Sequence, residues 1–296
     1  MFSCRTRGFC PSCHAKRLEE WGEWVRETLL LDVPHRQVVF TIPKMLRIFF
    51  KYNRRLLGEL CRCALRSLTR YFEVATGNAL MPGVIAAIQT FGTKINLHPH
   101  LHFLVTEGGV NEAGEFHKVP LIDDTRLAEL FGREVLADLV RKELLSPEWA
   151  EGLLSWRHTG FNVHSRVRAK TKTEAERVGK YMIRPLLSLE RLSLDEREGK
   201  VGYRYGKEAS EVERMDYLEF IARVTSHIPD KGQVTVRYFG LYANAHRGKV
   251  KKASLAVFPL RMVEELQPIP SKGWAEMINW GHVPNSLEFG TCPLLR

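Results

Sequence analysis

Two histidines stand two residues apart in the apolar segment His100-Leu101-His102. The pattern favours a β-strand, and successive side chains of a strand point to opposite faces, so both imidazoles project from one face. Neutral imidazole nitrogens bind divalent metal ions, and a bound cation polarises a phosphate oxygen. The alternative is a pair of ordinary strand histidines, one of them buried and hydrogen-bonded. Two imidazoles alone leave a metal site incomplete.

Tyr181 lies near the end of an expected helix further along the chain. Residues 172–184 have helical periodicity, Pro185 stops the helix, and Tyr181 lies near its end. Lys180 and Arg184 are close enough to help bind phosphate, with Arg184 at i+3 on the same side as Tyr181. A core or interface tyrosine between solvated charges is the alternative that the helix alone leaves open.

The charge balance favours a polyanionic partner. The 296 residues include 44 Lys and Arg against 34 Asp and Glu, a net charge of +10, although a solvated basic surface would give the same value. The run RGKVKK at 247–252 predicts a phosphate-contacting loop or a solvated turn. We expect Arg237 and Arg247 to join Lys180 and Arg184 in binding DNA. No window approaches about 18 uninterrupted apolar residues, which argues against a membrane partner.

Strand and helix patterns are interspersed, and 44% hydrophobic residues can fill a core. We expect strands at 36–42, 84–91, 100–110 with a return at 115–119, 161–168, 234–239, and a hairpin of 188–194 with 199–205. We expect helices from the amphipathic segment before Pro34, from Pro43 to about Phe72, at 124–145, 147–156 and 172–184, and around Tyr217 to Val224. The fold class predicted is α+β, with an antiparallel sheet that carries the histidines and helices on its faces.

The cysteines predict a reduced, cytoplasmic protein, because no charged and then apolar leader is present. Cys10 and Cys13 form a CxxC pair, half of what a structural zinc site needs, and Cys4 or His14 could add ligands in a cramped arrangement. Elsewhere, Cys61 and Cys63 are i,i+2 on an expected helix and are interpreted as packing residues.

Several segments together resemble one family. The string IQTFGTKINLHPHLHFLVTEGG at 88–109 is similar to the metal-site segment of HUH transposases from rolling-circle insertion sequences, the group that includes the common-region elements. Further along, HRQVVFTIP resembles their first core strand, GKYMIRPLLS their nucleophile helix, and IPDKGQVTVRYFGLYANAHRG their C-terminal core segment. CRTRGFCPSCHAKRLEEW resembles the end of their N-terminal zinc-binding region. The resemblance covers about residues 1–275.

The resemblance implies a chemistry and a set of site residues. His100 and His102 would bind Mg²⁺ or Mn²⁺ beside a phosphate of single-stranded DNA at a transposon end, and Tyr181 would attack phosphorus to give a 5′-phosphotyrosine. Gln89, on the preceding strand, is the expected third ligand. His98 could be an accessory ligand or a phosphate contact, and Glu107 could also approach the metal.

Many relatives carry a second tyrosine one turn before the nucleophile, where this chain has Arg177. The chain therefore resembles the single-tyrosine branch, in which two cleavages need sequential use of Tyr181 or a second subunit in a homodimer. One alternative function is a catalytically inactive remnant that only binds DNA. Another is a plasmid replication initiator or relaxase with the same site.

The two ends depart from the family pattern. Relatives carry another cysteine pair upstream, so we expect a shortened N-terminus whose zinc site, from Cys4, Cys10 and Cys13, is absent or strained. After SKGWAEMI the family continues into a CPxCG-like segment, whereas this chain has only Cys292. We expect a zinc-binding-like region at 1–34, the nuclease core at 35–265 and a poorly ordered tail at 266–296.

Overall fold

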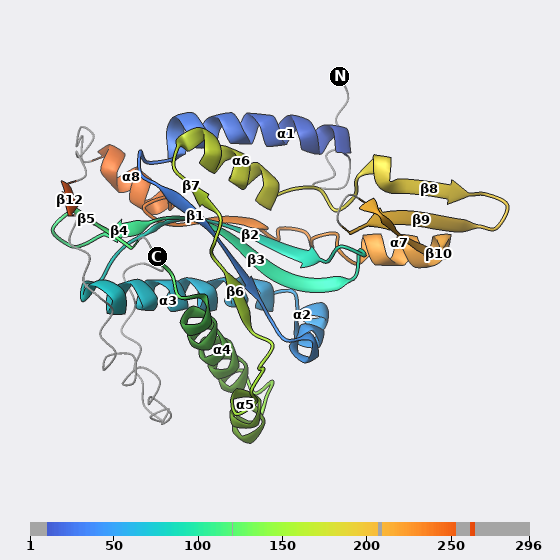
Figure 1. The fold of residues 1–296 in the computed structure, drawn as a ribbon, viewed down its shortest axis with the longest axis horizontal. Coiled ribbons are helices and arrows are strands. Elements are labelled where there is room, and N and C mark those ends of the chain that lie inside the picture. The colour runs from blue at the N-terminus through green and yellow to red at the C-terminus, as the bar shows by residue number, and fades with distance from the viewer. Residues whose placement is uncertain (1–10, 120, 207–208, 253–260, 264–296) are drawn as a thin grey trace.

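The computed structural model describes residues 11–119, 121–206, 209–252 and 261–263. A central antiparallel sheet has the strand order β11-β2-β3-β1-β6, and β7 also pairs with β1 (Figure 1). Its strands are β1 (His35–Thr41), β2 (Gly83–Phe91), β3 (Leu97–Thr106), β6 (Asn162–His164), β7 (Arg168–Ala169) and β11 (Val236–Gly240). β3 lies between β1 and β2, and its residues from Pro99 to Thr106 are buried. The predicted α+β class is confirmed.

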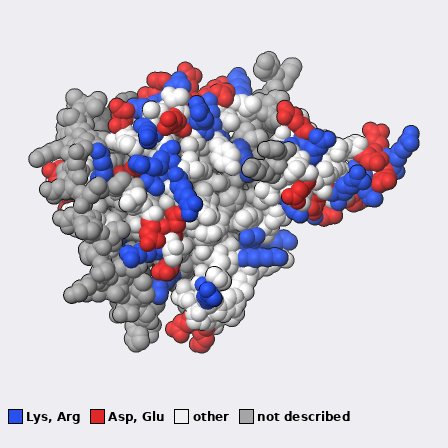
Figure 2. Space-filling view, in the orientation of Figure 1, with Lys and Arg blue, Asp and Glu red and all other residues white. Residues whose placement is uncertain are grey.

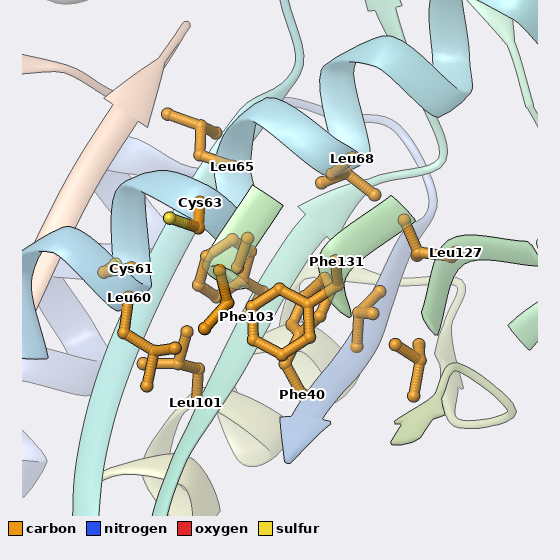
Figure 3. Packing of buried hydrophobic residues seen from close by; sticks show 14 of the residues in the cluster. Phe40, Leu60, Cys61, Cys63, Leu65, Leu68, Leu101, Phe103, Leu127 and Phe131 are labelled. Atoms are coloured by element: carbon orange, nitrogen blue, oxygen red, sulfur yellow. The ribbon is translucent and has the colours of Figure 1, made fainter. Parts of the chain in front are cut away.

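Two long helices cover the lower face of the sheet in Figure 1. They are α3 (Leu56–Thr76) and α4 (Asp124–Arg141), and α5 (Pro147–Leu154) continues from α4. Figure 3 shows the core between these helices and the sheet, where the Phe40 ring lies 5.2 Å from that of Phe103 and 5.0 Å from that of Phe131. Cys61 and Cys63 are buried there, and burial raises both thiol pKa values to about 12. Their interpretation as packing residues is confirmed.

Three helices cover the opposite face, above the sheet in Figure 1. They are α1 (Pro11–Trp24), which continues into a π-helical turn (Val25–Leu29), α6 (Lys172–Met182) and α8 (Asn244–Lys252). A second apolar cluster lies under them and includes Leu104, Ala175 and Met182. Trp21 on α1 donates a hydrogen bond to the Tyr238 hydroxyl on β11 at 2.7 Å. This layer holds α6 against the sheet.

One expected helix is interrupted. In place of a single helix from Pro43 to Phe72, the chain forms a 3-10 turn (Lys44–Leu46), α2 (Arg47–Tyr52) and then α3. Asn53, which separates α2 from α3, is extended, and its side-chain oxygen accepts a hydrogen bond from the Arg55 amide at 3.2 Å. Asn side chains compete in this way with the helical hydrogen bonds, so the continuous-helix prediction is wrong.

A three-stranded arm projects from the body at the right of Figure 1. It consists of β8 (Leu192–Asp195), β9 (Lys200–Tyr205) and β10 (Glu211–Asp216), with α7 (Tyr217–Thr225) packed on it. β8 and β9 pair antiparallel, which confirms the expected hairpin. A smaller sheet combines β4 (Gly108–Val110), β5 (Glu115–Lys118) and β12 (Arg261–Val263).

Two further expectations need correction. The segment 247–252 belongs to α8 and is not a loop. The strand expected at 100–110 ends at Thr106, because Gly108 has a φ of 139° and the Thr106 hydroxyl donates to its carbonyl at 2.7 Å. The tail at 266–296, with Cys292, lies outside the described residues. Among the described helices, none combines the length and apolar character needed to span a bilayer.

Candidate active site

The two strand histidines face the same side of the sheet, as their spacing predicts. On β3, His100 and His102 are both buried, and their rings lie 4.8 Å apart. Between and beyond them, Leu101 and Phe103 point into the core under α3, whereas Leu104 points toward α6. The imidazoles therefore lie on the face that α1 and α6 cover, close to the end of α6.

The local electrostatics keep these histidines neutral. Burial, with smaller effects of the neighbouring His100 and Arg184, lowers the pKa of His102 to about 3. Burial likewise lowers the pKa of His100, with smaller effects of Arg184 and Arg47, and lowers that of His98 to about 4. A neutral imidazole keeps the lone pair that a metal ion needs. The protonation state at neutral pH thus suits ligation.

Hydrogen bonds orient the two rings differently. Nδ1 of His100 donates to the His98 carbonyl at 2.7 Å, which leaves the Nε2 lone pair available. Nδ1 of His102 lies 3.1 Å from the side-chain amide of Gln37, a buried residue of β1. In the structure the amide nitrogen of Gln37 faces Nδ1, which places the ring proton of His102 on Nε2. With the amide turned by 180°, its oxygen would accept the Nδ1 proton and would leave Nε2 of His102 as the ligand atom.

Gln89 on β2 stands directly opposite His100 in the sheet register. Its side chain is buried, and its Nε2 donates to the carbonyl of Met182, the last residue of α6, at 2.5 Å. Its Oε1 is also buried but has no hydrogen-bond partner among the described residues. A buried acceptor without a partner is costly, and a metal ion beside the imidazoles would satisfy it.

The donor set at this position is two imidazole nitrogens and one carboxamide oxygen. In the described part of the chain, no group of three or more His, Cys, Asp or Glu side chains is placed to hold a metal. The carboxamide oxygen suits Mg²⁺ and Mn²⁺, whereas imidazole nitrogens are more typical of transition-metal ions, so this mixed set suits Mn²⁺ better than Mg²⁺. The residues therefore fit a divalent ion that keeps part of its coordination shell for water or a substrate oxygen.

Tyr181 lies beside the histidines. Its ring centre is 6.4 Å from that of His102, its side chain is 54% exposed, and the Arg184 guanidinium carbon lies 5.2 Å from the ring centre. The helix that presents it starts at Thr171, whose hydroxyl accepts from the Glu174 amide at 3.2 Å. The structure thus brings Tyr181, Arg184, His100 and His102 together.

Gly179 allows α6 to approach α1 closely. A β-carbon at Gly179 would lie 2.9 Å from the Trp21 ring on α1, closer than side chains pack. Arg177, the residue one turn before Tyr181, is exposed. Tyr181 is thus the one tyrosine of α6, and its ring lies beside that of His102.

Two of the residues expected to bind DNA, Lys180 and Arg237, lie away from the histidines. Lys180 turns toward α1, where its ammonium pairs with Glu19 and with Glu176 at 2.8 Å. Arg237 is opposite Ala86 of β2, on the face that α3 covers, and its guanidinium lies against Gly58 of α3. Because strand side chains alternate, Arg237 is on the other side of the sheet from the histidines.

Arg247, also expected to bind DNA, and Glu107, expected near the metal, have other partners as well. Arg247 lies on α8, with its guanidinium carbon 5.2 Å from the centre of the Trp24 ring. Glu107 follows the opposite end of β3 and pairs with Arg36 at 3.0 Å and with Arg168. The expectation that Glu107 approaches the metal is wrong, because about five residues of strand, roughly 16 Å, separate it from His102.

The N-terminal cysteines are only partly described. Cys4 and Cys10 lie outside the described residues, and Cys13 is half-buried in the first turns of α1. His14 follows on the same helix, and burial lowers its pKa.

Two residues near the site were missed as site residues. Gln37 is a polar residue inside an apolar strand, which was the available signal. Arg47, on α2, has a buried Nε without a hydrogen-bond partner in the described chain and lowers the pKa values of His98 and His100. Arg47 falls within the helix expected from Pro43 to about Phe72, but the sequence gave no sign that this part of the chain meets β3.

A histidine pair on a sheet beside a helix tyrosine is the arrangement that the resemblance to HUH transposases implies, and comparisons with known proteins agree with a transposase family. Residues 83–250 match the family described as "Putative transposase", and residues 1–42 match a transposase zinc-binding domain. The chain therefore belongs to this transposase family. No solved structure matches the chain significantly.

Two curated proteins are similar to the chain. It is 31% identical over 260 residues to the transposase for insertion sequence element IS801 of Pseudomonas savastanoi pv. phaseolicola, which covers 82% of this chain and 62% of that protein. It is 27% identical over 275 residues to the putative transposase y4qJ of Sinorhizobium fredii strain NBRC 101917 / NGR234, which covers 83% of this chain and 67% of that protein. The chain thus spans about two thirds of these relatives' length.

Proposed function

We propose that this chain cleaves and rejoins single-stranded DNA through a covalent bond between Tyr181 and a 5′ phosphate, at a divalent metal site formed by His100, His102 and Gln89. The observation that carries the proposal is the convergence of three separate segments. The ring centre of Tyr181, on α6, lies 6.4 Å from that of His102, on β3. Gln89, which is opposite His100 in the sheet register, donates a hydrogen bond to the Met182 carbonyl at the end of α6.

The metal fits the residues at this position. The Nδ1 of His100 is engaged by the His98 carbonyl, and the buried Oε1 of Gln89 lacks a partner among the described residues. When bound, the ion would polarise a phosphate oxygen and stabilise the negative charge that develops around phosphorus. Both histidines would bind through neutral nitrogens, consistent with the lowered pKa values.

The chain's own residues supply the covalent step. The Tyr181 oxygen forms a bond to phosphorus as the bond from phosphorus to the 3′ oxygen of the preceding nucleotide breaks. The phenol gives up its proton to solvent, which its 54% exposed side chain allows, and the leaving 3′ oxygen takes up a proton. Arg184, over the tyrosine ring, would stabilise negative charge on the phenolate and the phosphate.

The reverse step rejoins DNA without ATP. One phosphodiester bond is exchanged for one phosphotyrosine bond, so the free 3′ hydroxyl can attack phosphorus and release Tyr181. A chain with one such tyrosine can complete two cleavages by sequential use of Tyr181 or by pairing with a second copy. We propose the homodimer as the simpler arrangement for two simultaneous strands.

The transposase assignment is favoured over a replication initiator or relaxase by the two relatives, both described as transposases. Zinc binding by the N-terminal segment is also a proposal, and it rests on the zinc-binding domain match over residues 1–42 and on Cys4, Cys10 and Cys13.

The test uses purified protein, Mn²⁺ and a labelled single strand that carries the element's end. Wild type should form a denaturation-resistant adduct with the strand 3′ of the cut, and Tyr181→Phe should form none. His100→Ala and His102→Ala should lose nicking but keep strand binding, because binding comes mainly from cations that contact phosphate. Tyr205, on the arm, provides the matched control, since Tyr205→Phe should retain the adduct.

Two outcomes would contradict the proposal. An adduct that persists in Tyr181→Phe would place the nucleophile elsewhere. A wild type that binds single strands but forms no adduct would favour the inactive DNA-binding remnant.

A further inference from the structure

We infer that a groove beside the candidate active site holds the unpaired nucleotides that flank the cleaved phosphate. This inference rests on the proposed function for the kind of ligand. The groove has a volume of about 840 Å³ and begins at Gln89, Met182 and Arg184. A strand whose phosphate lies between Tyr181 and the histidines would therefore continue directly into it.

The groove has a shape and size that suit a single strand. Its walls come from α1, from the C-terminal end of β2, from the segment 182–186 at the end of α6 and from the segment 227–236 that precedes and enters β11. Sites for small ligands occupy about 300–1000 Å³, so this volume takes a few unpaired nucleotides.

The outer rim is held in place before any ligand binds. Arg54 donates to the Ile228 carbonyl at 2.6 Å and lies 3.9 Å from Asp230, and the Gln233 amide donates to the Asp230 carbonyl at 2.9 Å. Gly232, between these residues, has a φ of 82°, which favours glycine. The Ile88 amide of β2 joins the rim to the sheet through the Thr235 carbonyl at 2.8 Å.

Three cations of the groove are available for phosphate. Arg17, Arg184 and Lys231 are exposed, and none of them forms an ion pair with another described residue. Asp230 is the single carboxylate among the described residues that line the groove, and it faces Arg54. The groove therefore carries a net positive charge, which attracts a phosphate backbone.

The projecting arm lacks that charge pattern. Between residues 189 and 225 the sequence has seven Lys and Arg against nine Asp and Glu. Figure 2 shows the two signs side by side over the arm. A polyanion would gain little there, so the charge distribution favours the groove and not the arm as the path of the strand.

Aromatic and imidazole groups supply surfaces for bases. Trp21 of α1 and Phe91 of β2 both line the groove, and flat rings of this kind stack unpaired bases with little dependence on sequence. His14 has a buried Nε2 without a hydrogen-bond partner among the described residues, which could bind a base edge. His227 is not available, because its Nδ1 and Nε2 contact Thr90 at 3.0 Å and the Ile95 carbonyl at 3.1 Å.

The test measures binding separately from cleavage. All variants are made in the Tyr181→Phe protein, and a fluorescent oligothymidylate is titrated in EDTA between about 50 and 200 mM salt. The groove variant is Arg17→Gln with Lys231→Gln. The matched control is Arg133→Gln with Arg157→Gln, which removes the same charge from α4 and from the segment after α5.

The groove variant should bind the oligothymidylate about 3- to 10-fold more weakly, and the slope of log Kd against log salt should fall by about 1.4, because each single-strand phosphate contact contributes about 0.7. The control should change neither value. A hairpin duplex should bind both double variants alike.

An unchanged slope in the groove variant, or an equal loss of duplex binding, would overturn the inference. Because strand binding is measured without nicking, failure of the groove inference is distinguishable from failure of the proposed function. Adduct formation by protein with native Tyr181 decides that function separately.

Discussion

Gln89 links the two halves of the candidate site, and replacing it should separate its two roles. Its Nε2 donates to the Met182 carbonyl at 2.5 Å, and its Oε1 is the proposed metal ligand. Gln89→Leu keeps a similar volume but removes both groups. Gln89→Glu keeps an oxygen for the metal but replaces the donor with a second oxygen that cannot hydrogen-bond the Met182 carbonyl.

The contacts of Gln89 set the expected size of each effect. Met182 is at the end of α6, where carbonyls lack helical partners, so losing its buried hydrogen bond should cost about 1–3 kcal/mol in unfolding free energy in both variants. A lost oxygen ligand should raise the Mn²⁺ concentration for half-maximal nicking by about 10- to 100-fold in Gln89→Leu. In Gln89→Glu that concentration should stay the same or fall, because a carboxylate is a stronger ligand for Mn²⁺.

The assay combines urea unfolding with Mn²⁺ titration of nicking. Added Mn²⁺ should restore stability to Gln89→Glu, whose buried charge the ion would balance, but not to Gln89→Leu. Equal Mn²⁺ dependence in wild type and Gln89→Leu would refute the ligand role. Unchanged stability of both variants without metal would refute the role in holding α6.

Two further predictions concern neighbouring buried groups. Gln37→Leu should raise the Mn²⁺ concentration needed for nicking about 10-fold or more. Gln37→Glu should leave that concentration unchanged, because its carboxylate always accepts from Nδ1 of His102. Identical Mn²⁺ titrations of wild type and Gln37→Leu would exclude a positioning role for Gln37. Burial lowers the pKa of His35 to about 4, so the unfolded chain takes up this proton first as the pH falls below about 6.5. The stability that neutral His35 contributes is therefore present above about pH 6.5 and is lost as the pH falls toward 4. The free energy of unfolding should be lower by about 2.5 kcal/mol at pH 4.5 than at pH 7, which urea unfolding at the two pH values measures. An equally steep pH dependence in His35→Phe would assign the loss to other groups.

Much of the local structure could be predicted from patterns in the chain. Alternating apolar residues around His100 and His102 define a strand with both imidazoles on one face, whatever the strand packs against. The helix that carries Tyr181 follows from its periodicity and from Pro185 beyond its end. The hairpin of the arm is also local, because its turn joins adjacent segments.

Errors arose where a single side chain overrides a periodic pattern. Asn53 binds the backbone of Arg55 and ends α2, although the flanking residues continue the helical pattern. Arg237 fits a basic strand, but its place opposite Ala86 points it to the face that α3 covers. A cation's sign is visible in the sequence, whereas its partners depend on which element lies beside it.

The residue types and their spacing define the available chemistry, namely two imidazoles on one strand face, a tyrosine near a helix end and an excess of positive charge. Which of these groups meet depends on how the helices pack on the sheet. The approach of Tyr181 to His102 depends on α6 packing over the sheet, where Gly179 admits the Trp21 ring. Side-chain direction within an element follows from its local period, but distances between elements depend on strand register and packing among segments far apart in the chain.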